Sequence, residues 1–217
     1  MQVIDGHKCI DVFRTSVTGK EAHSSMPAIG VNAISAASKL VEEIDCIAAD
    51  VAASENDPHY EPPYSTVMVA MVDGGTAPNI VPRNCDVLWQ LRGLPGTKAK
   101  DAPSRLAAFA EETLLPGMRA VAPTASVDTK TETSVPAFSA APDSEAVSLA
   151  MTLTGANRAS GVSYATEAGL FQNAGCPAVV CGPGDIAQAH AADEFVAISQ
   201  IESCLEFLAK LTQRMRA

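Results

Sequence analysis

Two segments of this sequence carry residue types that could do chemistry, and the first surrounds His190. It lies in GPGDIAQAHAADEF (182–195), a stretch of glycine, proline and small residues. Imidazole is a common metal ligand, but a Zn²⁺ centre needs at least three protein ligands, usually from separate segments. His190 is therefore a candidate metal ligand whose partners must be found elsewhere. A histidine that only ties down a loop by hydrogen bonds is the alternative.

The residues just before this histidine favour a binding site at the same turn. Gly182, Pro183 and Gly184 follow the apolar stretch PAVVCG, and glycine lets a backbone approach a ligand closely. Open α/β sheets place their ligands beyond the carboxyl ends of such strands. Glu167 and Glu194 are nearby acids, for which capping or orienting roles are the favoured interpretation.

The second segment surrounds His23, in GKEAHSS, just before a predicted helix. A polar residue of a helix-entry loop is its simplest interpretation. Asn79 ends a glycine turn, and Arg92 ends a predicted strand. Both could face a carboxylate, which arginine binds in a bidentate fork. Turn chemistry for Asn79 and solvation for Arg92 are the alternatives, and spacing alone does not decide between them.

Other classes of function find no support. The sequence has no G-x-S-x-G, P-loop or G-x-G-x-x-G motif, and its acid pairs at 42–43 and 111–112 fall on predicted helices. A net charge of −10 without a basic cluster argues against nucleic acid or an anionic membrane as partner. No apolar run approaches membrane-spanning length. A small polar substrate or a protein partner is favoured.

The six cysteines lie in apolar stretches and form no C-x₂-C pair. Buried free thiols are the favoured interpretation, with disulfides as the alternative. Free thiols are typical of a reducing compartment, so we expect a cytoplasmic protein.

Hydrophobic periodicity predicts two successive architectures. Strand-like alternation and helical spacing between residues 9 and 134 give the order β-α-β-β-α-β, which is the ferredoxin-like arrangement of a four-stranded antiparallel sheet with two helices on one face. The segments that give it are 9–17, 30–49, 65–73, 85–95, 98–115 and 125–134.

The last third of the chain has a different pattern. Helices are expected at 144–153, 166–175 and 197–211, with a short strand at 177–182 that is apolar on both faces. Such strands are typical of a buried α/β sheet, but one or two are too few for a sheet of ordinary size. We therefore expect an incomplete α/β segment whose remaining strands lie elsewhere.

Three blocks of the sequence resemble consecutive blocks of the M20 metallopeptidase and deacylase family. They are GKEAHSSMPAIGVNAI, MVDGGTAPNIVP with WQLRGLPG, and YATEAGLFQNAGCPAVVCGPGDIAQAHAADEFV. The last block is most similar to the branch that hydrolyses N-acetylornithine to ornithine and acetate in arginine biosynthesis. The resemblance implies a two-metal α/β catalytic domain interrupted by a ferredoxin-like lid that forms a homodimer. Residues 1–8 would be a stub of the catalytic domain, 9–134 the lid, and 135–217 the returning part of the zinc-hydrolase domain.

The resemblance also implies roles for the candidate residues. His190 corresponds to the last ligand of a Zn²⁺ or Co²⁺ centre. His23 corresponds to a lid histidine that reaches the developing oxyanion from the partner subunit. Asn79 and Arg92 correspond to lid residues that hold the carboxylate of a small N-acyl amino acid, and residues 182–184 to a loop lining the pocket.

The chain departs from the family in what precedes the element Gly6-His7-Lys8. The family's other metal ligands and its general base lie N-terminal to that element, whereas this chain starts at Met1. We therefore expect a truncated chain that binds no metal alone and has no activity alone. The alternatives are a non-catalytic dimerisation module, a deacylase for another substrate such as an acylcitrulline or succinyl-diaminopimelate, and a split enzyme completed by a second polypeptide.

Overall fold

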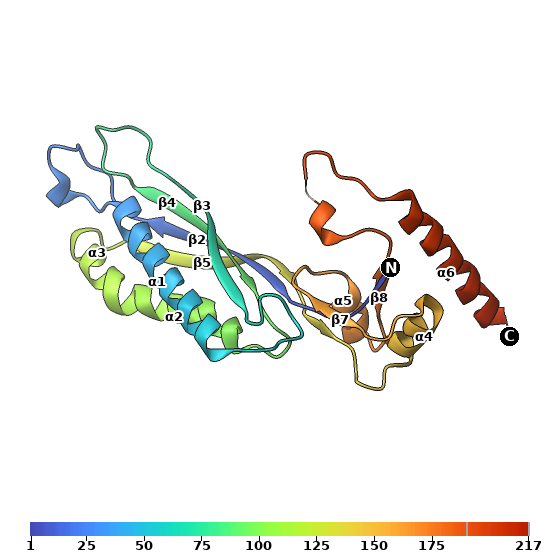
Figure 1. Ribbon diagram of the computed structural model, residues 1–217. Helices are drawn as coiled ribbons and strands as arrows, with labels where there is room; N and C mark the ends of the chain where they lie inside the picture. The colour runs from blue at the N-terminus through green and yellow to red at the C-terminus, as the bar shows by residue number, and fades with distance from the viewer. Residues whose placement is uncertain (190, 217) are drawn as a thin grey trace. The chain divides into compact units, whose positions relative to one another are not determined.

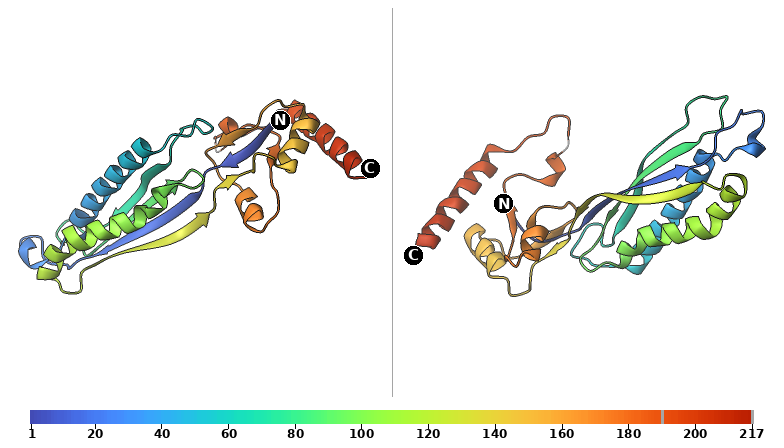
Figure 2. Two further views of the ribbon diagram at one scale, coloured as in Figure 1. Left: turned by 90° about the horizontal axis from the view of Figure 1, so that it is seen from below. Right: turned by 180° about the vertical axis from the view of Figure 1, so that it is seen from behind.

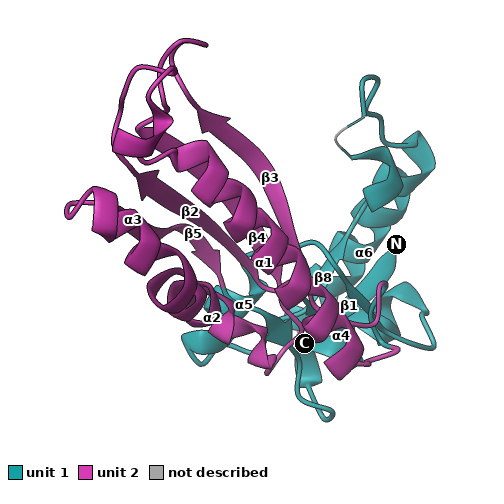
Figure 3. Ribbon diagram, turned by 90° about the vertical axis from the view of Figure 1, so that its left-hand side faces the viewer, with its two compact units in different colours: residues 1–8, 59–61, 136–217 teal, residues 9–58, 62–135 magenta. Residues whose placement is uncertain are grey.

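A computed structural model describes residues 1–189 and 191–216, and the chain divides into two compact units (Figure 3). Unit 2 consists of residues 9–58 and 62–135. Unit 1 consists of residues 1–8, 59–61 and 136–217. The short segment 59–61 belongs to unit 1 although both of its flanking segments belong to unit 2.

Unit 2 contains an antiparallel four-stranded sheet in the order β3-β4-β2-β5. Its strands are β2 (Ile10–Thr18), β3 (Thr66–Gly74), β4 (Asn84–Arg92) and β5 (Ser126–Val135). Strands β2 and β5, the first and last of the unit, are neighbours in the sheet. Strands β3 and β4, which follow one another in the chain, are neighbours as well. This order confirms the predicted ferredoxin-like arrangement.

The helices of unit 2 cover one face of this sheet (Figures 1 and 2). They are α1 (Ala33–Ser54), α2 (Ala102–Phe109) and α3 (Leu115–Val121), with 3₁₀ turns at Pro27–Ile29 and Lys98–Asp101 and a π-helical turn at Ala110–Leu114. Helix α1 begins where the side chain of Asn32 accepts a hydrogen bond of 3.1 Å from the backbone N–H of Ser35. The second predicted helix is therefore longer than expected and is interrupted by the π turn.

The core of unit 2 follows the alternation of β4. Its side chains Cys85, Val87, Trp89 and Leu91 are buried, and α1 packs above them. The helix contributes the fully buried Leu40, Ile44 and Ile47. Burying side chains of this size stabilises a fold by about 1.5–3 kcal/mol each, which explains why the alternation predicts the sheet face correctly.

Unit 1 is built around β1 (Gln2–His7), which is its central strand. Strand β7 (Ser160–Val162) pairs parallel to β1, whereas β6 (Phe138–Ser139) and β8 (Val180–Gly182) pair antiparallel. Its helices are α4 (Glu145–Thr154), α5 (Ala168–Asn173) and α6 (Ile198–Arg216), with a 3₁₀ turn at Ile186–Gln188. None of the helices in the described part of the chain combines the length and the apolar character needed to cross a bilayer.

The sequence pattern missed most of this sheet. It assigned no strand to residues 1–8, yet β1 is central and His7 and Lys8 are fully buried. A strand buried on both faces shows no alternation, and strands of two or three residues are too short to give a periodic signal.

The structure corrects one prediction about the cysteines. All six are free, and Cys9 and Cys85 are buried as expected. However, Cys46 and Cys176 are exposed, because the first lies on the solvent side of α1 and the second follows the end of α5. Burial, reinforced by the charge of Asp11, raises the pKa of Cys9 to about 11, so this thiol is not a reactive nucleophile.

Candidate functional site

His23 and Asn79 lie together at one end of the unit 2 sheet. Residue 23 forms an isolated β-bridge with Ile80, and the carbonyl of Asn79 accepts a hydrogen bond of 3.0 Å from the N–H of Ser24. The ring Nδ1 of His23 lies 2.8 Å from the hydroxyl of Ser25 and accepts from its N–H at 3.2 Å. Both predicted residues are exposed.

Arg92 lies at the opposite end of β4. Its Nε donates a hydrogen bond of 3.2 Å to Oε1 of Gln90, two residues back along the strand. Asn84, at the start of β4, is eight residues away, which corresponds to about 26 Å at about 3.3 Å per residue. The length of the strand therefore separates Arg92 from the pair formed by His23 and Asn79 within one copy of unit 2.

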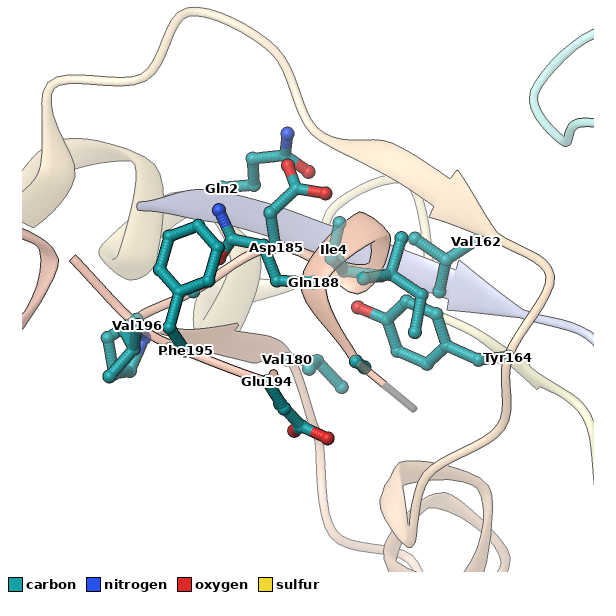
Figure 4. A pocket seen from close by; sticks show the side chains of 15 residues that line it. Gln2, Ile4, Val162, Tyr164, Val180, Asp185, Gln188, Glu194, Phe195 and Val196 are labelled. Carbon is teal, nitrogen blue, oxygen red and sulfur yellow. The ribbon is translucent and has the colours of Figure 1, made fainter. Parts of the chain in front are cut away.

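The three residues of the predicted pocket loop lie in unit 1. Gly182 ends β8, and Gly184 has a φ of 94°, in the left-handed region that favours glycine. Together with Pro183 they line a cavity of about 360 Å³ (Figure 4). This volume lies in the range of small-molecule sites.

The cavity has apolar walls and a set of oxygen-bearing groups. Ile4, Val162, Val180, Phe195 and Val196 are among the apolar residues, and Gln2, Tyr164, Asp185, Gln188 and Glu194 supply the polar side chains. Figure 4 shows Gln2, Asp185 and Gln188 gathered at one end, beside the ring of Phe195. The described lining residues include neither lysine nor arginine.

Two details define the electrostatics of this cavity. Oδ1 of Asp185 accepts a hydrogen bond of 2.9 Å from the N–H of Ala187, which fixes the carboxylate at the start of the 3₁₀ turn. Burial, with the charge of Asp185 as the smaller cause, raises the pKa of Tyr164. The phenol therefore stays protonated at neutral pH.

His190, the predicted metal ligand, lies outside the described residues. Within residues 1–189 and 191–216 no group of three or more His, Cys, Asp or Glu side chains is arranged to hold a metal ion. These described residues therefore do not fit a Zn²⁺ or Co²⁺ centre by themselves, and no catalytic step through a metal is derived from them.

Two further histidines, His7 and His59, have hydrogen-bond partners in unit 1. His7 is buried, and its Nε2 accepts a hydrogen bond of 3.3 Å from the N–H of Thr166. Desolvation lowers its pKa from 6.5, so the ring is neutral at pH 7. His59 contacts Oδ1 of Asp5 at 2.6 Å through Nε2. No periodic signal marks either residue, because each depends on partners distant in sequence.

Comparisons with known proteins agree with this architecture. The chain is 31% identical over 210 residues to an acetylornithine deacetylase of Aliivibrio salmonicida, covering 96% of this chain and 53% of that protein. It is 32% identical over 213 residues to an acetylornithine deacetylase of Proteus mirabilis, covering 98% and 53%. The chain thus spans about half the length of the curated relatives it matches.

Solved structures share the fold at lower identity. Aminopeptidase PepT of Bacillus cereus superposes with a TM-score of 0.65 at 20% identity, covering 95% of this chain and 52% of that one. A tripeptidase of Staphylococcus aureus gives 0.69 at 18% identity, with the same two coverages of 95% and 52%. Residues 5–118, more than half of the chain, match the family described as peptidase dimerisation domain, of the M20 type. The chain therefore belongs to the M20 peptidase dimerisation-domain family.

Proposed function

We propose that this chain is the lid-bearing part of an M20 amidohydrolase that hydrolyses N-acetylornithine to ornithine and acetate. The observation that carries the proposal is the similarity to acetylornithine deacetylases, at 31% identity over 96% of the chain. It extends through both units and is not confined to the dimerisation domain. In this proposal residues 9–134 are the lid, and residues 1–8 and 135–217 are parts of the catalytic domain.

The geometry of His23 supports a role in stabilising negative charge. Its Nδ1 is engaged by Ser25, which orients the ring and directs Nε2 to a ligand. A hydrogen bond from Nε2 to the oxygen of a tetrahedral intermediate would stabilise the charge that develops there. In our proposal His23 and Asn79 act together on a substrate molecule held by the partner subunit. Arg92, at the other end of β4, contacts the other substrate molecule of the dimer.

His190 is proposed as one ligand of the metal, Zn²⁺ or Co²⁺, which in the complete enzyme supplies an activated water. The remaining ligands would come from the polypeptide that the relatives possess and this chain does not span. The pocket beside residues 182–184 would hold the amino-acid part of the substrate.

A homodimer through the edge of β3 is part of the proposal. Both edges of the unit 2 sheet are open to pairing, but they differ in character. Strand β3 exposes Met68, Met71 and Val72 by 48%, 63% and 52%, whereas the other edge strand, β5, carries Lys130 and Glu132. Charged edges resist pairing and apolar edges favour it, so a second copy fits β3.

Co-expression tests this function. The chain is produced together with the remaining polypeptide of the Aliivibrio salmonicida relative, zinc is added, and release of ornithine from N-acetylornithine is measured. We expect hydrolysis that falls by about 10²–10³ in His23→Ala, the loss typical of an oxyanion donor. A complex that forms, binds zinc and hydrolyses no N-acyl amino acid would contradict the proposal.

One other function is favoured by a specific observation. Residues 5–118 match the M20 peptidase dimerisation domain, so a non-catalytic dimerisation module is the second candidate. Such a module would dimerise but would not form the co-expressed complex. Hydrolysis of an acylcitrulline or of succinyl-diaminopimelate in preference to N-acetylornithine would assign a different M20 substrate.

A further inference from the structure

We propose that the unit 1 pocket is an ammonium-binding subsite, in which Asp185 is the charge partner of the cationic side-chain end of an N-acyl diamino acid. The inference rests on the proposed function and assigns specificity to residues for which neither the fold nor the family match provides a role. It also makes a prediction about binding that does not require turnover.

The pocket offers the acceptors that an ammonium needs. A primary ammonium has three N–H donors and no acceptor. Asp185 contributes a carboxylate, Gln2 and Gln188 contribute amide oxygens, and Tyr164 contributes a hydroxyl to the same cavity (Figure 4). Because Oδ1 of Asp185 accepts a hydrogen bond from the N–H of Ala187, we assign Oδ2 to the ligand.

The charge balance of the cavity selects against anions. Asp185 and Glu194 are acidic, and no lysine or arginine belongs to the described lining. The ring of Phe195 lies beside Asp185 and Gln188 in Figure 4, where its face can contact a cation. The carboxylate of Glu194 points away from this group in the same view, so Asp185 is the acid assigned to the ligand.

The apolar walls account for the rest of a diamino acid. Ile4, Val162 and Val180 line the cavity beside Tyr164 and bury the methylene groups that separate the ammonium from the α-carbon. Ala189 also lines the cavity and directly precedes His190 in the chain. The subsite is therefore adjacent in sequence to the proposed metal ligand.

Binding to the chain itself tests the inference. Calorimetry or NMR titration compares N-acetylornithine with N-acetylnorvaline, which has the same carbon skeleton without the ammonium. We expect at least about tenfold tighter binding of N-acetylornithine, since a hydrogen bond to a charged group contributes about 1.5–3 kcal/mol. In Asp185→Asn this preference should disappear. The asparagine side chain can still accept the hydrogen bond from the N–H of Ala187, but it lacks the negative charge.

Two further variants complete the design. Asp143→Asn removes the same charge from unit 1 outside the pocket and should leave the preference intact. Tyr164→Phe keeps the packing and should reduce the preference, because the ammonium loses one of its hydrogen-bond acceptors. Equal affinity for the two probes, an unchanged preference in Asp185→Asn, or no binding at about 10 mM ligand would each overturn the assignment.

Failure of the ammonium subsite and failure of the proposed function would give different experimental results. A co-expressed complex that hydrolyses N-acetylnorvaline as well as N-acetylornithine would overturn the subsite and leave the amidohydrolase intact. A complex without hydrolase activity would refute the proposed function, while the binding preference of the chain would still be measurable.

Discussion

The indole N–H of Trp89 donates a hydrogen bond of 2.9 Å to the hydroxyl of Thr15, in the interior of unit 2. Both residues are fully buried, and Thr15 Oγ1 also lies 2.8 Å from Oγ1 of Thr129. The pair joins β4 to β2, which are adjacent in the sheet. It provides the buried indole with the acceptor it needs.

Thr15→Val should destabilise unit 2 by about 1–3 kcal/mol, because the indole N–H loses its acceptor while the volume is conserved. The fluorescence of Trp89, the single tryptophan, reports the urea midpoint. Thr18→Val is the matched control on the same strand and should change the stability by less than about 0.5 kcal/mol. Equal effects of the two variants would show that the hydrogen bond contributes little.

Gly161→Ala should destabilise unit 1. A Cβ at this position would lie 2.7 Å from the carbonyl oxygen of His59 and 2.8 Å from Cε1 of Tyr60, and overpacking of this kind costs about 1–3 kcal/mol. Gly117→Ala, where nothing lies within 4 Å of the added Cβ, should be neutral or slightly stabilising. Hydrogen exchange near residues 59–61 measures the effect, and unchanged protection in Gly161→Ala would contradict it.

Unit 1 should lose stability as the pH falls through 6.5. Burial holds the pKa of His7 below 6.5 in the folded state, so the unfolded chain takes up a proton first. The contribution of His7 is therefore fully present above pH 6.5 and declines toward its folded pKa. Urea unfolding at pH 7.5 and 5.5 should show a smaller difference in His7→Gln than in the wild type. The same difference in both would exclude His7 as the titrating group.

Met71→Lys should shift the chain from dimer to monomer in sedimentation velocity. Met71 is 63% exposed on β3, and a lysine on an edge strand opposes pairing with a second copy. Thr131→Lys, at an exposed position of the other edge strand β5, is the control and should leave the dimer intact. If Thr131→Lys dissociated the dimer and Met71→Lys did not, the dimer interface would lie at β5 and not at β3.

The isolated chain should contain far less than one zinc per chain after exposure to the metal and should not hydrolyse N-acetylornithine. The reason is that the described residues contain no group of three potential ligands, and a single imidazole does not retain Zn²⁺ against water. Elemental analysis and the assay are made on one sample. Stoichiometric zinc with turnover would require ligands and a base that have not been identified.

The alternation in β4 was enough to predict the sheet of unit 2, because Cys85, Val87, Trp89 and Leu91 share the buried face on which α1 packs. The bulge in β3 was not predictable, since the register shifts between Val69 and Met71 only in response to pairing with β4. It places Met71 opposite Leu88 and so determines which apolar side chains the edge exposes.

For the candidate site, sequence motifs alone were enough to propose His23, Asn79 and residues 182–184. Each of them belongs to a turn or loop that can be recognised from the neighbouring residues. The pocket around Asp185 required β1, β7 and β8 to meet, and no local pattern specifies that meeting.

The sequence by itself therefore determined the βαββαβ unit, whose signal is periodic and local, and the identity of the glycine-rich loop. Only the tertiary structure decided that Gln2 and Ile4 lie in one pocket with Tyr164 and Asp185. It also decided that Arg92 is separated from His23 by the length of β4. The physical reason is that hydrophobic periodicity reports which face of a helix or strand is buried. Contacts between distant segments depend instead on strand order and register, and side-chain packing fixes these only when the chain folds.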